Sequence, residues 1–280
     1  MSQNHVENMQ ALANKYPDHC SFFSYKDSKE KFGSIVLDNW LGTALFKTST
    51  VLDSPLYLSL LWKTIKTWQP NSLWLSQELA SERGLIDIAK TYDAVVLACG
   101  YKIKDLIGET IGPLKAELTF VRGQNLIIDE NEITRKTTTQ FDDLKSLSHD
   151  GNSYALLCGE YKVPNLQFKT IIGATHEYSP SLLSAPPDMT VAYNLLQDKL
   201  IKLCKPPQKI DYAVAGVRVN SKRSHEGKLP LIGRLQDNIY LITAMGSRGL
   251  LYHSYASKLL ANFVLDDDYA KEIPQEILYI

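Results

Sequence analysis

The stretch IYLITAMGSRGLL, Ile239 to Leu251, runs from a strand pattern through two glycines directly into a helix pattern. Such a turn directs free backbone N–H groups and the positive end of a helix at whatever binds above it. Gly246 and Gly249 would let a ligand approach the backbone closely. A phosphate, a carboxylate or an electron-rich ring edge would suit this turn, and a tight connection without a ligand is the alternative. Ser247 directly follows Gly246, which is not the arrangement of a serine-hydrolase elbow.

Working outward, continuous apolar and β-branched runs predict the strands. Tyr92 to Gly100, YDAVVLACG, is expected to be a central parallel strand that is covered on both faces. Further strands are predicted at Phe120 to Ile128, Tyr154 to Cys158, Thr170 to Ala174, Tyr212 to Asn220 and Ile239 to Ala244. Few helices separate these later runs, so we expect that block to form an antiparallel sheet.

Capping residues followed by apolar residues at helical spacing predict the helices. Asp53 precedes a helix from Ser54 to Lys66, and Asp188 or Thr190 precedes a second helix. A third begins near Arg248 and stops before three aspartates. The first helix should bury one face, made of Leu56, Leu60, Leu61 and Ile65.

Composition is that of an ordinary globular protein: 280 residues, 44% hydrophobic and 22% charged, with a net charge of -1. The sequence lacks the basic excess that would indicate a nucleic-acid partner. The scattered cysteines form no CxxC pair, and the first residues resemble no leader, so we expect a cytoplasmic protein without a metal site. Residues 1–40 are polar and weakly patterned, and we assign 41–280 to one domain.

Two charged groups stand out. Arg218 lies in the apolar strand AVAGVRV, where a guanidinium requires a partner. An acidic substrate group or an internal Asp or Glu would satisfy it. The second group is a basic cluster that is usual for a solvated face but could touch RNA phosphates: Lys199, Lys202, Lys205 and Lys209. The histidines form no HExxH pattern.

Taken in order, DAVVLACG, RGQ, GVR, KLPLIG and GSRGL resemble FAD-dependent oxidoreductases of the D-amino-acid oxidase type. That family includes glycine oxidase, sarcosine oxidase and the FAD domain of the tRNA wobble-uridine modifying protein MnmC, to which GVR, LPLIG and GSRGL are most similar. The resemblance runs from about Trp40 to about Leu265. It implies a mixed α/β fold, in which an FAD-binding Rossmann-like layer is interleaved with an antiparallel β-sheet substrate domain.

The resemblance also implies roles for individual residues. Arg218 would bind a substrate carboxylate or shape the flavin face, and Arg122, Gly123 and Gln124 would mark the crossing between the layers. The remaining matches would contact FAD: Ala98, Gly100, Gly246, Ser247, Arg248, Gly249 and Leu250. The implied chemistry is hydride transfer to flavin from the carbon beside an amine, in a free amino acid or in a tRNA-borne aminomethyl group.

The sequence departs from this family in one respect, because it contains no GxG for the FAD pyrophosphate. We therefore expect the Rossmann-like layer to be incomplete and FAD to bind weakly. A second chain could supply the ADP-binding segment, and the chain could instead be a degenerate member that serves as a non-catalytic binding domain. A missing strand should also expose a strand edge that invites association.

Overall fold

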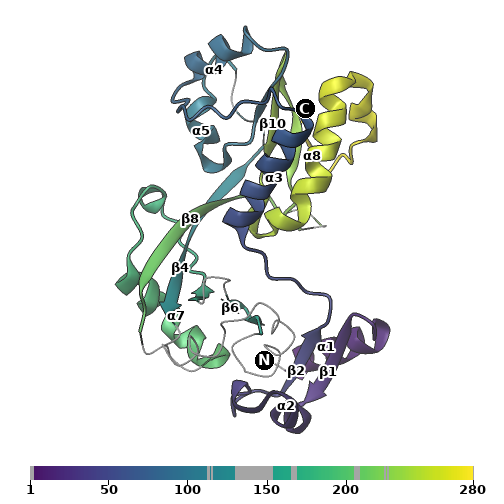
Figure 1. Ribbon diagram of the computed structural model, residues 1–280, viewed down its shortest axis with the longest axis vertical. Coiled ribbons are helices and arrows are strands. Elements are labelled where there is room, and N and C mark those ends of the chain that lie inside the picture. Colours follow the sequence, from purple (N-terminus) through teal and green to yellow (C-terminus); the bar gives the residue numbers. More distant parts are fainter. Residues whose placement is uncertain are drawn as a thin grey trace. The chain divides into compact units, whose positions relative to one another are not determined.

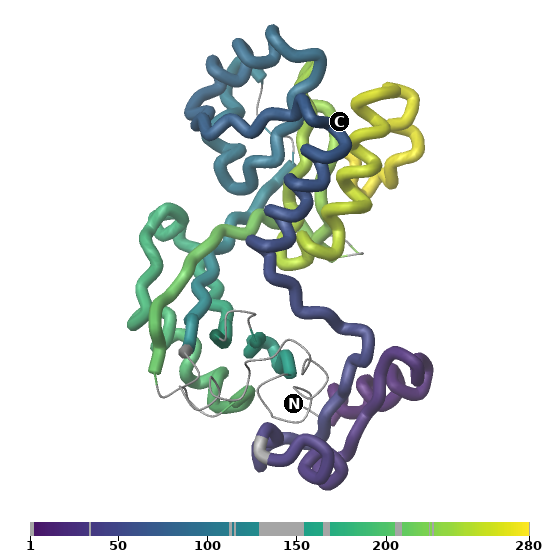
Figure 2. Tube along the Cα trace, in the orientation of Figure 1, coloured from purple at the N-terminus to yellow at the C-terminus, as the bar shows by residue number. Residues whose placement is uncertain are grey.

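The computed structural model describes residues 3–111, 114, 116–129, 154–164, 169–204, 209–223, 225 and 227–279. The chain, whose trace is drawn in Figure 2, divides into two compact units. Each unit is assembled from three separate stretches of the sequence. Unit 1 comprises 1–73, 124–175 and 187–215, and unit 2 comprises 74–123, 176–186 and 216–280. None of the helices in the described ranges combines the length and apolar character needed to span a bilayer.

Unit 1 begins with a small layer of helices and a two-stranded antiparallel sheet (Figure 1). Ser24 caps its second helix by accepting a hydrogen bond from the Asp27 N–H. The elements are α1 (Gln3–Lys15), β1 (Cys20–Ser24), α2 (Tyr25–Phe32), η1 (Gly33–Ile35) and β2 (Gly42–Phe46). The polar N-terminal segment is therefore built into regular structure.

Helix α3 (Ser54–Trp68) follows, and its Asp53 cap is confirmed, since Asp53 Oδ1 accepts from the Leu56 N–H at 3.0 Å. The prediction that α3 buries one face is wrong. No residue of α3 is buried, and its large apolar side chains are exposed: Leu56, Leu58, Leu60, Leu61, Ile65 and Trp68. The stripe predicted from spacing is present, but no element of the described residues covers it.

Strands β4 to β8 make a five-stranded sheet in the order β5-β6-β7-β4-β8. The pairings of β5 with β6, β6 with β7 and β7 with β4 are antiparallel, as expected. The strand bounds are β4 (Leu118–Asp129), β5 (Leu156–Cys158), β6 (Glu160–Pro164), β7 (Lys169–Gly173) and β8 (Tyr212–Ser221). Sequence patterning missed β6, whose run EYKVP mixes charges and a proline with its apolar residues.

Helix α7 (Met189–Leu203) packs against this sheet in unit 1. Asp188 is its N-cap and accepts from the Val191 N–H at 2.9 Å, which decides between the two candidate caps. The shared core consists of Leu126, Ile128, Ile172, Ala192, Leu196, Leu200 and Cys204. This apolar contact holds the helix on the sheet.

Unit 2 contains a four-stranded sheet in the order β11-β9-β10-β3. Its strands are β3 (Val95–Leu97), β9 (Leu231–Gln236), β10 (Ile239–Thr243) and β11 (Leu278–Tyr279), of which β3 and β10 are parallel and β9 and β10 antiparallel. Two expectations are corrected here. Strand β10 belongs to this sheet and not to the antiparallel block, and β3 is an edge strand, with Val96 46% exposed.

The helical segments of unit 2 are α4 (Glu82–Ala89), η2 (Gly100–Lys102), α5 (Ile103–Leu106), η4 (Pro180–Leu182), η5 (Gly246–Arg248), α8 (Gly249–Leu265) and η6 (Asp267–Glu272). Helix α8 buries Ala256, Leu259, Leu260 and Phe263 against the sheet. The protein thus combines a layer that contains parallel strands with an antiparallel sheet, as the mixed α/β prediction states.

Candidate functional site

The turn between β10 and α8 is the centre of the candidate site. Ala244 and Gly246 both have positive φ, 58° and 55°, so the chain reverses sharply as the strand ends. A side chain at Gly246 would place its Cβ 2.7 Å from Asn220 Oδ1. The positive φ therefore favours glycine at this position, and a Cβ there would also require the Asn220 side chain to move.

Helix α8 begins without a side-chain cap. Arg248 occupies the cap position and makes no capping hydrogen bond from its side chain, and Gly249 starts the helix. The first-turn N–H groups of an uncapped helix are donors for a ligand, and the helix dipole adds positive potential. This end of α8 can therefore hold an anion or an acceptor-rich ring edge.

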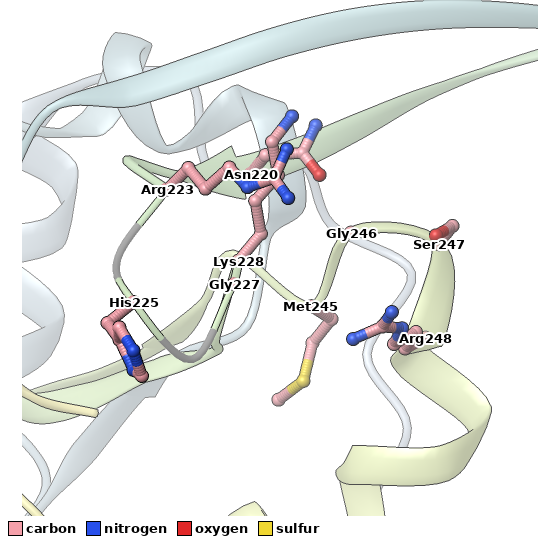
Figure 3. A pocket seen from close by; sticks show the side chains of 9 residues that line it. All are labelled: Asn220, Arg223, His225, Gly227, Lys228, Met245, Gly246, Ser247 and Arg248. Carbon is pink, nitrogen blue, oxygen red and sulfur yellow. The ribbon is translucent and has the colours of Figure 1, made fainter. Parts of the chain in front are cut away.

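A basic pocket of about 420 Å³ opens at this turn (Figure 3). Asn220 at the end of β8 pairs with Met245 in an antiparallel bridge, which joins the two sides of the pocket. The lining residues are Asn220, Arg223, His225, Gly227, Lys228, Met245, Gly246, Ser247 and Arg248. Gly246, Ser247 and Arg248, three of the residues that the resemblance assigns to FAD, therefore line this pocket.

Other predicted site residues lie apart from this lining. Gly249 and Leu250 continue into α8, and Ala98 and Gly100 follow β3 in exposed positions. Gly100 has φ 57° and starts η2. Between them, burial raises the pKa of the Cys99 thiol, and the nearby Asp105 carboxylate raises it further. The Cys99 thiol at the end of β3 therefore loses its proton at a higher pH than an ordinary thiol.

Arg218 is half-buried on β8, and its Nη1 lies 3.2 Å from His176 Nε2. The expected internal carboxylate is not found: no salt bridge joins Arg218 to an Asp or Glu among the described residues. A neutral imidazole nitrogen can accept one guanidinium hydrogen. The other N–H donors of the Arg218 guanidinium make no hydrogen bond to the residues that the structure describes, and water or a ligand could accept from them.

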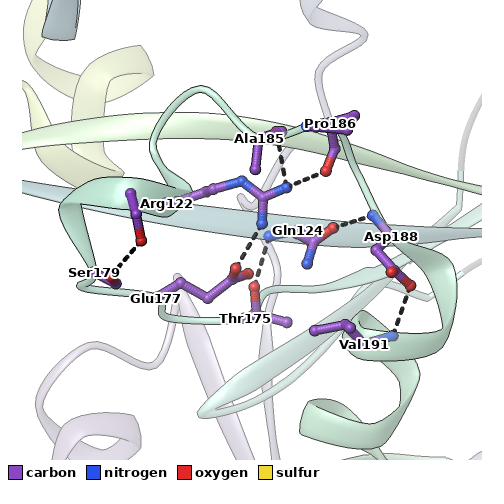
Figure 4. Close-up of polar contacts among 10 residues, drawn as sticks. Arg122, Gln124, Thr175, Glu177, Ser179, Ala185, Pro186, Asp188 and Val191 are labelled. Atoms are coloured by element: carbon purple, nitrogen blue, oxygen red, sulfur yellow. Dashed lines mark hydrogen bonds and ion pairs between the residues drawn. The ribbon is translucent and has the colours of Figure 1, made fainter.

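Arg122 carries a buried ion pair in unit 2 (Figure 4). Its Nη1 lies 2.6 Å from Glu177 Oε2, and its Nη2 donates to the carbonyls of Ala185 and Pro186. The chain passes from unit 2 to unit 1 between Gly123 and Gln124, which is where the crossing was expected. Arg122 therefore orders the segment 177–186.

Gln124 plays a similar part within unit 1 (Figure 4). Its backbone N–H donates to Thr175 Oγ1 at 2.8 Å, and its side-chain Oε1 accepts from the Asp188 N–H at 2.7 Å. Asp188 is the N-cap of α7. The side chain of the RGQ glutamine thus fixes the start of that helix.

Two of the four lysines in the predicted basic cluster, Lys199 on α7 and Lys209 beyond its end, lie beside carboxylates. Lys199 pairs with the carboxylate of Glu160, whose side chain is only 6% exposed. Lys209 lies 3.9 Å from Asp211, and Lys205 lies outside the described residues. An RNA-binding surface on this helix therefore has little support.

Sequence reasoning missed Asn220, Arg223, Lys228 and Met245 as pocket residues. The loop SKRSHEGK has a high density of basic residues, and that signal was available. What the sequence could not indicate is that this loop faces the turn before α8, since the bridge between Asn220 and Met245 forms only in the folded chain.

The residues at the turn fit the edge of a flavin. The uncapped N–H groups of α8 can donate to ring acceptors, and Gly246 leaves the backbone bare. Gly246, Ser247, Arg248 and Gly249 would hold the ring, whose chemistry is hydride acceptance. The described residues hold no group of three His, Cys, Asp or Glu that would bind a metal.

This fold and turn are those of a flavin-dependent oxidoreductase. The sequence matches the family DAO, FAD dependent oxidoreductase, over residues 5–263. The chain therefore belongs to the DAO family of FAD-dependent oxidoreductases, whose cofactor is FAD. The match includes the N-terminal layer, upstream of Trp40 where the resemblance was first placed. No curated protein matches the sequence.

Several solved structures share the fold. Glycine oxidase from Geobacillus kaustophilus has a TM-score of 0.68 at 12% identity, covering 95% of this chain and 69% of that one. Iminodiacetate oxidase from Chelativorans sp. BNC1 has a TM-score of 0.62 at 13% identity, with 95% and 70% covered. L-α-glycerophosphate oxidase from Mycoplasma pneumoniae, solved with FAD bound, has a TM-score of 0.60 at 11% identity, with 94% and 71% covered.

Proposed function

We propose that this chain provides the flavin-edge and substrate-binding part of an FAD-dependent amine oxidoreductase that acts on a C–N bond. The substrate would be an amino acid or an aminomethyl group on a tRNA wobble uridine. The observation that carries the proposal is the turn Gly246–Gly249, which leads into an uncapped helix beside a pocket and belongs to a chain of the DAO family. Bound FAD would supply the hydride acceptor.

The protein residues would bind and orient the reactants. Gly246, Ser247, Arg248, Gly249 and Leu250 would hold the pyrimidine edge of the flavin, where the α8 dipole favours negative charge. We assign the end of β3, at Ala98 and Gly100, to the cofactor side on the family resemblance. The positive φ of Gly100 supports a need for bare backbone there.

Arg218 would bind a substrate carboxylate. Its contact with His176 holds the guanidinium in one orientation and leaves N–H donors for a second partner. A carboxylate accepts two parallel hydrogen bonds from such a group. Glycine oxidase and iminodiacetate oxidase are named for amino-acid substrates, which supports this assignment. The motifs GVR, LPLIG and GSRGL, which are similar to MnmC, support the tRNA-borne alternative.

A second chain would supply the ADP-binding segment, because the sequence has no GxG motif for the FAD pyrophosphate. Two exposed surfaces support such a partner. In unit 1, α3 presents an uncovered apolar stripe, with Trp68 77% exposed. In unit 2, β3 is an uncharged edge strand whose one neighbour in the sheet, β10, is parallel to it. In a parallel sheet, a strand such as β3 ordinarily has a further strand beside it, and a helix that joins the two strands covers the sheet.

A flavin titration tests the proposal. The purified chain is titrated with FAD, and the quenching of flavin fluorescence and the visible flavin spectrum are recorded. Saturable binding, followed by bleaching of the flavin band with an amine substrate under anaerobic conditions, is expected. A well-folded chain that perturbs neither signal at any FAD concentration would favour the non-catalytic binding domain.

The role of Arg218 is tested separately. In Arg218→Ala, flavin binding should persist while bleaching by a carboxylate-bearing amine is lost at least tenfold, because the substrate loses a charged hydrogen bond. Arg83→Ala, on the distant helix α4, is the matched control and should bleach like the parent protein. Equal bleaching in Arg218→Ala would show that this arginine does not bind substrate.

A further inference from the structure

Three cations line the basic pocket. Arg223 and Lys228 come from the loop that joins β8 to β9, and Arg248 comes from the turn before α8 (Figure 3). None of the three has a carboxylate within salt-bridge distance among the described residues, and none of the described lining residues is acidic. Like charges gathered in one pocket repel each other unless an anion offsets them.

Neighbouring cations are arranged differently. Lys222 is adjacent to Arg223 in sequence, and its Nζ lies 3.2 Å from Glu117 Oε2. Arg234, on the next strand, pairs with Asp267. Lys222 and Arg234 thus have carboxylate partners, whereas Arg223, Lys228 and Arg248 have none among the described residues.

We propose that the basic pocket binds a phosphate group of the substrate through Arg223 and Lys228, beside the turn that we assign to the flavin. The inference refines the substrate class and rests on the proposed function for its catalytic meaning. A terminal phosphate ester carries about 1.5 to 2 negative charges and three acceptor oxygens, whereas a carboxylate and a backbone phosphate of RNA each carry one charge. The guanidinium fork of Arg223 and the point charge of Lys228 are both groups that proteins use for phosphate.

The size of the pocket indicates that phosphate is only part of the ligand. A volume of about 420 Å³ lies within the range of small-molecule sites, which is roughly 300 to 1,000 Å³. The shared chemistry is thus a phosphate ester. It could belong to a free small molecule or to the backbone of an RNA, and the two sources differ in how binding depends on length and salt.

The test uses the full chain, without flavin, and isothermal titration with uridine monophosphate and with uridine. We expect the phosphate to improve affinity at least tenfold, as charged hydrogen bonds contribute about that factor. Arg223→Ala and Lys228→Ala should each remove most of that difference, and Arg223→Lys should restore part of it. Lys222→Ala is the matched control, because its cation pairs with Glu117, and should bind like the parent protein.

A fluorescein-labelled single-stranded RNA oligonucleotide distinguishes the two sources. Tighter binding than uridine monophosphate, with strong salt dependence that Arg223→Ala reduces, assigns the site to RNA. Equal or weaker binding assigns it to a small phosphate ester. Indistinguishable binding of uridine monophosphate and uridine, or phosphate binding that survives both alanine substitutions in folded protein, overturns the proposal.

Flavin binding by the same variants separates this inference from the proposed function. If Arg223→Ala and Lys228→Ala lose phosphate binding but retain flavin, both proposals stand. If the chain binds phosphate but never changes the fluorescence or the visible spectrum of flavin, the result contradicts the oxidoreductase function and leaves the phosphate site standing. Flavin binding without any preference for phosphate contradicts the phosphate site alone.

Discussion

Arg122 and Glu177 are joined three times: their backbones exchange two hydrogen bonds of 2.9 Å, and their side chains form a buried ion pair of 2.6 Å. The Arg122 side chain is only 3% exposed and that of Glu177 6%. Burying two charges is costly, so a pair of this kind depends on every member being present. The contact fixes the segment 177–186 on the start of β4.

Removing one partner of this pair should destabilise the protein strongly. In Arg122→Met the buried Glu177 carboxylate loses its counter-charge, and we expect the free energy of unfolding to fall by about 3 to 5 kcal/mol. Urea unfolding followed by circular dichroism measures it. Lys90→Met is the control, since it breaks the exposed pair with Asp87 and should cost less than about 1 kcal/mol. Similar losses in the two variants would contradict the prediction.

Gly246→Ala should weaken both stability and flavin binding. The alanine must adopt φ 55°, which costs about 1 to 2 kcal/mol, and its Cβ meets Asn220 Oδ1. Thermal unfolding and FAD titration give the two readouts. Gly216→Ala is the matched control, because no atom lies within 4 Å of its Cβ position and its φ is not positive. A Gly246→Ala protein as stable as Gly216→Ala would rule out the conformational requirement.

Charges placed on the stripe of α3 should reduce association without unfolding the chain. Leu58 and Ile65 are 63% and 43% exposed, so Leu58→Lys with Ile65→Lys should change the free energy of unfolding by about 0.5 kcal/mol or less. Dye binding to exposed apolar surface and self-association in gel filtration should both decrease. Ser59→Lys, on the same helix, is the control. Unfolding of the double variant would mean that this face is buried.

The Cys99 thiol should react slowly with iodoacetamide. Burial and the Asp105 carboxylate raise the pKa of Cys99, so less thiolate is present at a given pH. The rate of alkylation should therefore begin to rise at a higher pH in the folded protein than in a peptide that contains Cys99. Because the pKa of Cys99 is higher in the folded protein than in the unfolded chain, its protonated form favours the folded state. This contribution to the free energy of unfolding is present below the unfolded pKa and is lost as the pH rises through the folded pKa. Labelling followed by mass spectrometry checks this, and a peptide-like profile would contradict it.

Local signals in the sequence were sufficient for many elements. The caps Asp53 and Asp188 are both confirmed, because a side chain that accepts from an N–H three residues on acts within one helical turn. The strand β4 and the turn before α8 also follow from composition and glycine placement. The order of short motifs indicated the family, which the match over 5–263 confirms.

Only the tertiary structure decided which surfaces are covered and which charges meet. The stripe of α3 and the run VVL of β3 have the patterns of buried elements, yet α3 is exposed and β3 is an edge strand with Val96 exposed, because burial depends on whether a neighbour is present. Pairing of Arg122 with Glu177 joins residues 55 positions apart, and the bridge between Asn220 and Met245 brings the basic loop to the turn. The sequence by itself determined the local elements and the family, since these depend on neighbours along the chain. Long-range pairing determined the pocket and its charge, since these depend on neighbours in space.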